Sequence, residues 1–397
     1  MIPRNRLKSS LASMLALFLA LGMAASLFAE AASPEYSLSA DAAASVVLAA
    51  SGFDPLSADS AAAFGLSANL LHRIEAPGWG LVLSHALDLS AASSAPTVTV
   101  YEAYARLDAG DSAQFFLGKR RMGLGIGTTF APGDAIDPRS GFWDQKNGFR
   151  GFGATASLGS DIALRFAASL DRSFDAYAAG MAAKAAAKAG PTSQPAIAAK
   201  AAYANALGDA DGPADPRLVV WAASAEVQAG SLQVAAAGTY SPDYALRPSL
   251  GLSLDLGGLI LQAEGAVELK GGPYWFATGG ARETWSSGDA SLTLSLDYDY
   301  NGAAGLLRRT HYLLPNARFG LAERFDLYAR ALVELEAPSA LLSTGLTFYP
   351  VQGFDIELTG TFALGAGGEE LATLPAPPSP TAEALRNAIG LAARVHF

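Results

Sequence analysis

The sequence predicts an all-β protein: a transmembrane, antiparallel, up-and-down β-barrel of about 18 strands (16–18), with a short helical insertion in one long loop. Three observations predict this fold. The first residues have the features of an export signal, and the remainder alternates apolar and polar side chains with a period of two. Short connections also alternate with connections that include every long insertion.

Composition excludes several classes of protein. The chain of 397 residues contains no cysteine, which rules out a disulfide framework, a thiolate metal site and a cysteine nucleophile. Its net charge of -10 argues against a nucleic-acid partner, because phosphate binding needs a basic surface. After the first 31 residues, no stretch is long and apolar enough to cross a bilayer as a helix.

Residues 1–31 are predicted to be a signal peptide. Three basic residues, Arg4, Arg6 and Lys8, precede an apolar run from Leu11 to Phe28, and small residues follow up to Ala31, where cleavage is expected. A single uncleaved anchoring helix is the alternative reading of the same run. Either way the chain is exported, and residues 32–397 form the predicted barrel domain.

The period of two is clearest in residues 291–300, where Leu and Tyr occupy every even position and Ser, Thr and Asp every odd one. Residues 259–269, 325–335 and 354–362 show the same alternation, with Leu332 as an exception on a polar face. The predicted strands are 36–48, 60–74, 79–90, 97–108, 112–120, 148–159, 161–171, 217–229, 231–240, 247–256, 258–269, 273–286, 289–300, 308–320, 323–335, 339–349, 352–364 and 386–397.

Connection length separates a membrane barrel from a soluble β-sandwich, which shows the same alternation. Every second connection is tight: Ala76-Pro77-Gly78, Ala109-Gly110, Gly159-Ser160, Ala229-Gly230, Gly257-Gly258, Ser287-Gly288, Leu321-Ala322 and Pro350-Val351. The long insertions 121–147, 172–216 and 365–385 all fall on the other side. Outer-membrane barrels have this asymmetry, with short periplasmic turns and longer outer loops. We therefore expect the chain in the cell outer membrane, in contact with its lipid.

The last strand ends on an aromatic residue. Counting back in twos from Phe397 gives Val395, Ala393, Leu391 and Ile389, all apolar. This resembles the C-terminal assembly signal of bacterial outer-membrane proteins. The resemblance implies that these five residues are recognised by the barrel-assembly machinery.

A basic cluster precedes the first long insertion. Lys119, Arg120 and Arg121 are followed by a glycine-rich stretch and then by Phe130, Pro132 and Asp134. This resembles a strand-and-loop signature of several porin-like families, in which a basic strand end and an acidic loop lie within the barrel mouth. The resemblance implies pore-lining or constriction roles for Lys119, Arg120, Arg121, Asp134, Asp137, Arg139, Asp144, Lys146 and Arg150. A solvated outer loop whose charges pair with one another is the alternative.

The second insertion is predicted to be helical. Alanine-rich stretches at 182–188 and 196–207 favour one or two short helices, broken at Gly190-Pro191 and at Pro195. Whether these helices plug the lumen or stand outside stays open. The third insertion, rich in proline, is predicted to be a flexible outer loop.

The expected function is passive diffusion of small solutes or ions through a charge-lined aqueous lumen, because a barrel of about 18 strands is wide enough to hold water. A non-conducting surface protein of the adhesin or receptor type, with a plugged lumen, is the main alternative. An outer-membrane lipid-modifying enzyme is a third class, but no G-x-S-x-G motif is present and no catalytic residue is predicted. The four histidines lack ligand-like spacing, so neither a metal nor a cofactor is expected. A homo-oligomer is compatible with this fold, although nothing in the sequence identifies a subunit interface.

Overall fold

A computed structural model describes most of the chain outside the first 33 residues. The described residues are 34–50, 61–90, 96–124, 126, 148–189, 193–208, 210–241, 245–269, 273–302, 311–336, 339–365 and 387–396. The predicted signal peptide, most of insertion 121–147 and all but one residue of insertion 365–385 lie outside these ranges.

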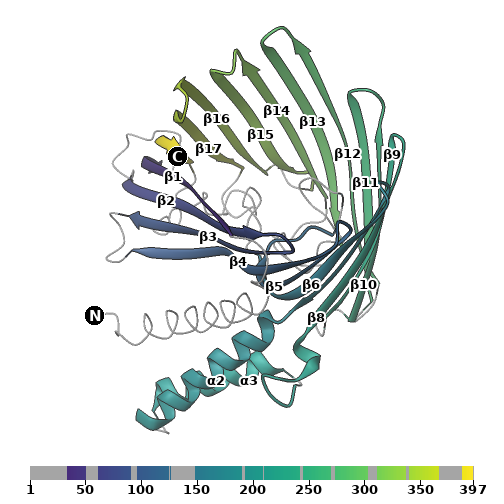
Figure 1. Ribbon diagram of the computed structural model, residues 1–397. Helices are drawn as coiled ribbons and strands as arrows, with labels where there is room; N and C mark the ends of the chain where they lie inside the picture. The colour runs from purple at the N-terminus through teal and green to yellow at the C-terminus, as the bar shows by residue number, and fades with distance from the viewer. Residues whose placement is uncertain are drawn as a thin grey trace.

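Eighteen strands form one antiparallel sheet that closes on itself (Figure 1). They are β1 (Glu35–Ala50), β2 (Ala61–Ala76), β3 (Trp79–Ser90), β4 (Thr97–Ala109), β5 (Ala113–Arg120), β6 (Phe149–Leu158), β7 (Ile162–Ser169), β8 (Val220–Ala229), β9 (Leu232–Ser241), β10 (Ala245–Asp255), β11 (Leu259–Glu268), β12 (Tyr274–Ser287), β13 (Ala290–Asn301), β14 (His311–Leu321), β15 (Phe325–Glu334), β16 (Ser339–Val351), β17 (Phe354–Leu364) and β18 (Asn387–His396). The predicted fold class and strand number are confirmed.

Closure joins the two ends of the chain. Each strand pairs with the next, and β18 pairs with β1 over a register that runs from Asp41 opposite His396 to Ala50 opposite Asn387. Every described strand therefore has a hydrogen-bonded neighbour on both sides. In a bilayer this matters because an unpaired backbone group in hydrocarbon costs several kcal/mol.

Tight turns connect the strands at one end of the barrel, where the sequence predicts them. Gly110 and Gly230 lie in two of these turns with φ of 68° and 61°, a conformation that residues with a Cβ atom rarely adopt. One predicted turn is displaced: β16 continues through Pro350 and Val351, and the chain reverses at Gln352 and Gly353 instead.

The second insertion contains two helices, α2 (Asp171–Ala189) and α3 (Gln194–Leu207), followed by the short 3-10 helix η1 (Pro216–Leu218). Helix α2 begins eleven residues before the predicted helical stretch. Pro195 does not break a helix but lies in the first turn of α3, after the N-cap Ser193, where a missing N–H costs nothing. Among the helices of the described residues, none is both long enough and apolar enough to cross a membrane.

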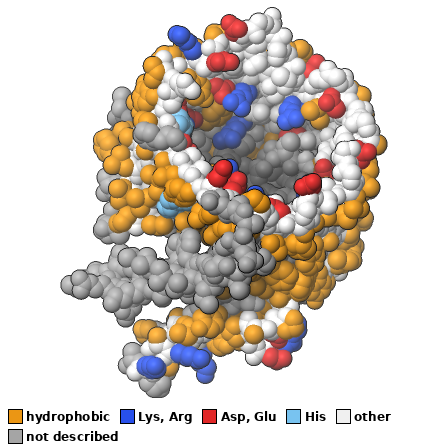
Figure 2. Space-filling view, viewed as in Figure 1, with side chains coloured by type: hydrophobic (Ala, Val, Ile, Leu, Met, Phe, Trp, Pro, Cys, Tyr) orange, Lys and Arg blue, Asp and Glu red, His pale blue; other side chains and the backbone are white. Residues whose placement is uncertain are grey.

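The two faces of the wall differ in the predicted way. On β13, Leu294 and Leu296 are 42% and 51% exposed on the outside, whereas Asp297 is 6% exposed on the inside. Leu332 on β15 is fully buried on the inner face, as its position in the alternation requires. Figure 2 shows the result: hydrophobic side chains cover the outer wall, and charged side chains line a hollow.

Candidate functional site

The hollow enclosed by the strands is the candidate site. Lys and Arg side chains lie on its wall, and Asp and Glu side chains surround its mouth (Figure 2). Several inward carboxylates are almost fully buried, among them Glu264 on β11, Asp297 and Asp299 on β13, and Asp355 on β17. Charges in such positions must be hydrated or paired, because an isolated buried charge is costly.

After β5 the chain turns into the barrel. Met122 and Leu124 are 7% and 1% exposed, and they form a cluster with four inward residues: Phe116 on β5, Phe149 on β6, Ala167 on β7 and Ala222 on β8. An outer loop would leave such side chains in water. Residues 121–124 and 126, here called the inward segment, therefore lie along the inner wall.

Small residues make room for this segment. Gly151 and Gly153 on β6, Ala167 on β7 and Ala222 on β8 present little or no side chain to the interior. At Gly251 on β10 the fit is closest, since a Cβ atom there would lie 2.5 Å from Cγ1 of Ile126. The wall from β6 to β10 is thus shaped to receive the segment.

Hydrogen bonds fix the segment at both ends. The amide of Arg121 donates to Oε1 of Glu102 on β4 at 3.2 Å. The amide of Ile126 donates to Oε2 of Glu264 on β11 at 2.8 Å. Glu264 is 4% exposed, and a charge-assisted bond to a buried carboxylate is about twice as strong as a neutral one.

Two of the predicted site residues lie where this segment begins. The guanidinium of Arg120 lies over the rings of Tyr104 and Phe116, at 5.1 and 4.8 Å from their centroids. Arg121 stacks over Tyr101 at 4.6 Å. The aromatic rings of β4 and β5 thus hold both cations where the chain leaves the wall.

Two other predicted residues face outward. Lys119 on β5 lies opposite Arg150 on β6 in the strand register. Both are in phase with Leu117 and Phe152, which lie on the outer surface. The Lys119 Nζ donates to the backbone oxygen of Val100 at 2.6 Å. Arg150 pairs with Asp171 and Asp175 at the start of α2, which stands outside the barrel. The alternation of a strand sends neighbouring side chains to opposite faces, so neither Lys119 nor Arg150 lines the lumen.

The remaining predicted site residues, Asp134, Asp137, Arg139, Asp144 and Lys146, lie outside the described residues.

Charge clusters at the closing strands were not singled out from the sequence. Asp355 on β17, 3% exposed at its side chain, lies 3.5 Å from Arg394 and 2.6 Å from Nε2 of His396. The other ring nitrogen of His396 lies 2.6 Å from Asp41 on β1, and Arg394 also pairs with Glu357. These five residues, here called the seam cluster, span β17, β18 and β1. Their positions on the polar faces of the strands could be predicted from the sequence. The proximity of Asp41 and His396, which are 355 positions apart, could not.

Further ion pairs bridge inward positions of neighbouring strands elsewhere. Arg247 donates to Glu268 at 2.7 Å, and Arg165 donates to Glu226 at 2.7 Å. Opposite charges therefore share the inner wall, which creates local fields without leaving large uncompensated charge.

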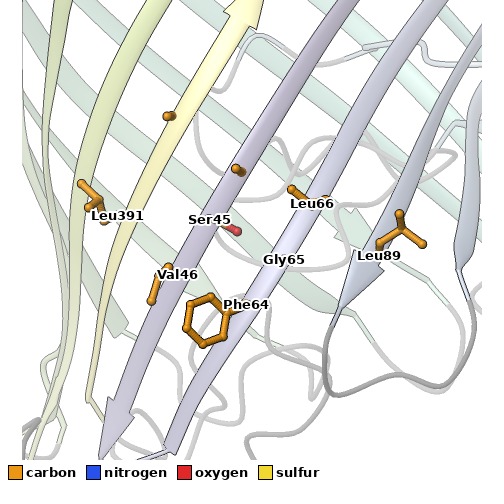
Figure 3. A pocket seen from close by; sticks show the side chains of 9 residues that line it. Ser45, Val46, Phe64, Gly65, Leu66, Leu89 and Leu391 are labelled. Carbon is orange, nitrogen blue, oxygen red and sulfur yellow. The ribbon is translucent and has the colours of Figure 1, made fainter.

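The outward apolar positions of β18 agree with the predicted alternation. Leu391 is 52% exposed, and Ile389, Ala393 and Val395 share its face, whereas the inward Ala388 is buried. Phe397 lies outside the described residues. A shallow apolar recess of about 520 Å³ opens on this outer surface between β18 and β3, bordered by Phe64, Leu66, Leu89 and Leu391 (Figure 3).

The histidines do not assemble a metal site. His72 and His85 stack on the outer surface of β2 and β3 with ring centroids 5.4 Å apart. In the part of the chain that the structure describes, no group of three or more His, Asp or Glu side chains could hold a metal ion.

Neither a protein-family model nor a curated protein matches the chain. Solved structures do match its fold. The crystal structure of Acinetobacter baumannii OccAB4 superposes with a TM-score of 0.56 at 9% identity, covering 91% of this chain and 98% of that one. Pseudomonas aeruginosa OccK2 (OpdF), in complex with glucuronate, gives a TM-score of 0.55 at 13% identity with the same coverage. At these identities the likeness shows a shared barrel fold.

Proposed function

We propose that the chain is a porin-like channel of the outer membrane, through which small solutes or ions diffuse passively along a charge-lined aqueous lumen. One observation carries this proposal: a closed wall of 18 strands presents charged side chains to its interior and half-exposed leucines to its exterior. A barrel of this size leaves an aqueous channel, whereas an eight-stranded one is filled by its side chains.

The inward segment is proposed to narrow this lumen. Arg120 and Arg121 stand at its start, Met122 and Leu124 fix it to the wall, and Glu264 binds its far described end. Asp134, Asp137, Arg139, Asp144 and Lys146 are proposed to continue the constriction. Charges within a narrow hydrated passage select ions by sign, because the field there is strong and little screened.

Location and partners follow from the same proposal. The chain is exported, its signal peptide is removed near Ala31, and the apolar face of β18 guides insertion by the barrel-assembly machinery. Outer-membrane lipid covers the outer wall, and the chain acts as a monomer or a homo-oligomer. It is a channel and not an enzyme.

Conductance of the refolded mature chain in a planar lipid bilayer tests the proposal. Stepwise, ohmic current increments are expected, and glucuronate, the solute in the OccK2 structure, is a first compound for competition. A silent barrel would instead be a surface protein with a filled lumen. Turnover of phospholipid or lipopolysaccharide would assign it to the enzymes.

The constriction has its own test in Arg120→Ala and Arg121→Ala. One unit charge acts on an ion 4 Å away with about 1 kcal/mol in water-like surroundings, so each variant should raise the cation-to-anion permeability ratio about two- to fivefold. Reversal potentials in a salt gradient measure this ratio. Arg150→Ala, on the outward face of the neighbouring strand, is the matched control and should leave selectivity unchanged. Equal ratios in all four proteins would remove the constriction.

A further inference from the structure

Helix α2 carries a row of large apolar side chains that stay about half exposed in the described structure. Phe174, Tyr177 and Met181 are 47%, 60% and 52% exposed. Their spacing of three and four residues places them on one face of the helix. Single exposed apolar residues are ordinary on a protein surface, but a continuous row marks a contact surface.

Basic residues extend the row. Lys184 and Lys188 follow Met181 at i+3 and i+7 on the same face of α2. The neighbouring helix α3 carries its own exposed residues, Ile197, 53% exposed, and Lys200. From residue 176 to residue 208 the chain contains three lysines and neither Asp nor Glu, although the whole protein has a net charge of -10. The hairpin of α2 and α3 is therefore a local basic and apolar patch on an acidic protein.

Contacts between the first turn of α2 and β6 determine the height of this patch along the barrel wall. Arg150, outward on β6, lies 5.0 Å from the ring centroid of Phe174 and pairs with Asp171 and Asp175. Along the strands from Arg150, the outward rings of Phe152, Phe166 and Trp221 form a cluster with centroids 5.9 to 6.4 Å apart. Outward aromatic clusters of this kind lie at the boundary between lipid and water.

The hairpin leaves the barrel at that boundary. Strand β7 ends at Ser169 and α2 begins at Asp171, so the helix starts beside the aromatic cluster. Figure 1 shows α2 and α3 directed away from the wall and not across the opening. The row from Phe174 to Lys188 spans about 21 Å at 1.5 Å per residue, long enough to lie over several lipid headgroups.

We propose that this face of α2 rests on the outer leaflet of the membrane, with its apolar residues among the upper acyl chains and Lys184 and Lys188 on anionic phosphate headgroups. This inference rests on the proposed membrane location of the barrel. Interfacial helices combine an apolar face with lysines in this way, and lysines near an anionic surface strengthen the binding. The hairpin thus acts as a lateral anchor that sets the barrel's height and local lipid composition.

The absence of cysteine allows a direct test, because a single introduced cysteine takes a nitroxide label at one site. Three variants of the full chain are compared in liposomes: Met181→Cys in the row, Ala182→Cys, and Leu296→Cys on the outer wall of β13. Residue 182 is exposed but lies 100° further around the helix, so it is the matched control. Accessibility to oxygen, which concentrates in lipid, is measured against accessibility to a water-soluble nickel chelate.

The label at 181 should resemble the label at 296, with more oxygen than nickel contact, and the label at 182 should show the reverse. If 181 resembles 182 while 296 is in lipid, the anchor is overturned and the membrane barrel stands. If 296 is also in water, the proposed function itself fails. Dipolar broadening between labels at 181 on separate copies would assign the face to a second copy of the chain and overturn lipid contact.

Headgroup recognition is tested with the same label. Lys184→Glu with Lys188→Glu should reduce oxygen accessibility at 181 severalfold in vesicles that contain phosphatidylglycerol, and should change it little in phosphatidylcholine. An equal effect in both lipids would show that the lysines do not recognise anionic phosphate.

Discussion

Single small residues decide where the inward segment lies. Ala167 on β7 and Ala222 on β8 pack against the segment beside Phe149, and Gly251 on β10 admits the side chain of Ile126. These small side chains leave room for the segment between the larger inward residues of the wall. A side chain at position 251 would occupy the space that Ile126 fills.

Gly251→Val should displace the segment from the wall. Its Cβ would lie 2.5 Å from Cγ1 of Ile126, and overpacking of this kind costs about 1–3 kcal/mol. We expect an altered single-channel conductance with noisier open levels, measured in planar bilayers.

Gly238→Val on β9 is the control, because a Cβ there meets no atom within 4 Å. If the two valine variants conduct alike, the segment does not depend on the space at position 251.

At the scale of strands, the seam cluster fastens the last strand to the first. Asp355 on β17 contacts both Arg394 and His396 on β18, and His396 in turn reaches Asp41 on β1. Among the described strands, β18 pairs with β17 and with β1, and its ladder with β1 joins residues near the two ends of the barrel. Charged contacts across the ladders add to the hydrogen bonds that hold the barrel shut.

Asp355→Asn should weaken this closure. A hydrogen bond to a charged partner contributes about 1.5–3 kcal/mol, and Asp355 is almost fully buried. We expect the variant to unfold at lower urea concentration in lipid vesicles and to lose its heat-modifiable gel mobility at lower temperature.

Asp41 contacts the same histidine from an exposed position. The variant Asp41→Asn should therefore lose less free energy of unfolding, about 0–1 kcal/mol. An equal loss of stability in both variants would contradict the larger contribution proposed for Asp355.

Helices α2 and α3 form a second element, whose base is held by charge. Arg217 donates to Asp215, and backbone amides of Asp211 and Arg217 add to this, which holds the pKa of the Asp215 carboxyl well below its usual range.

Deletion of residues 176–208 with a short Gly-Ser bridge should leave conductance unchanged, because the hairpin lies outside the lumen (Figure 1). A larger conductance after deletion would show that the hairpin obstructs the pore.

For the whole molecule, the barrel was predictable because its physics is local. Alternation along each strand and the length of each connection are written in neighbouring residues, and together they predict eighteen strands and their faces. The same alternation could have separated Lys119 from Arg120, since Lys119 is in phase with Phe115 and Leu117.

Other features depend on distant contacts that no local pattern encodes. The bond from Ile126 to Glu264 joins residues 138 positions apart, and the seam cluster joins the two ends of the chain. The start of α2 at Asp171 was missed because Phe174, Asp175 and Tyr177 are weaker helix formers than the alanines that follow. Contacts with Arg150 compensate there.

Cysteine scanning of β13 in liposomes tests the central claim, that one face of each strand meets a water-filled lumen and the other meets lipid. In the cysteine-free chain, single cysteines at Thr293, Ser295 and Asp297 should react with a charged, water-soluble maleimide, and those at Leu292, Leu294 and Leu296 should not. Reaction at all six positions, or at none of the inward three, would contradict a hydrated transmembrane barrel.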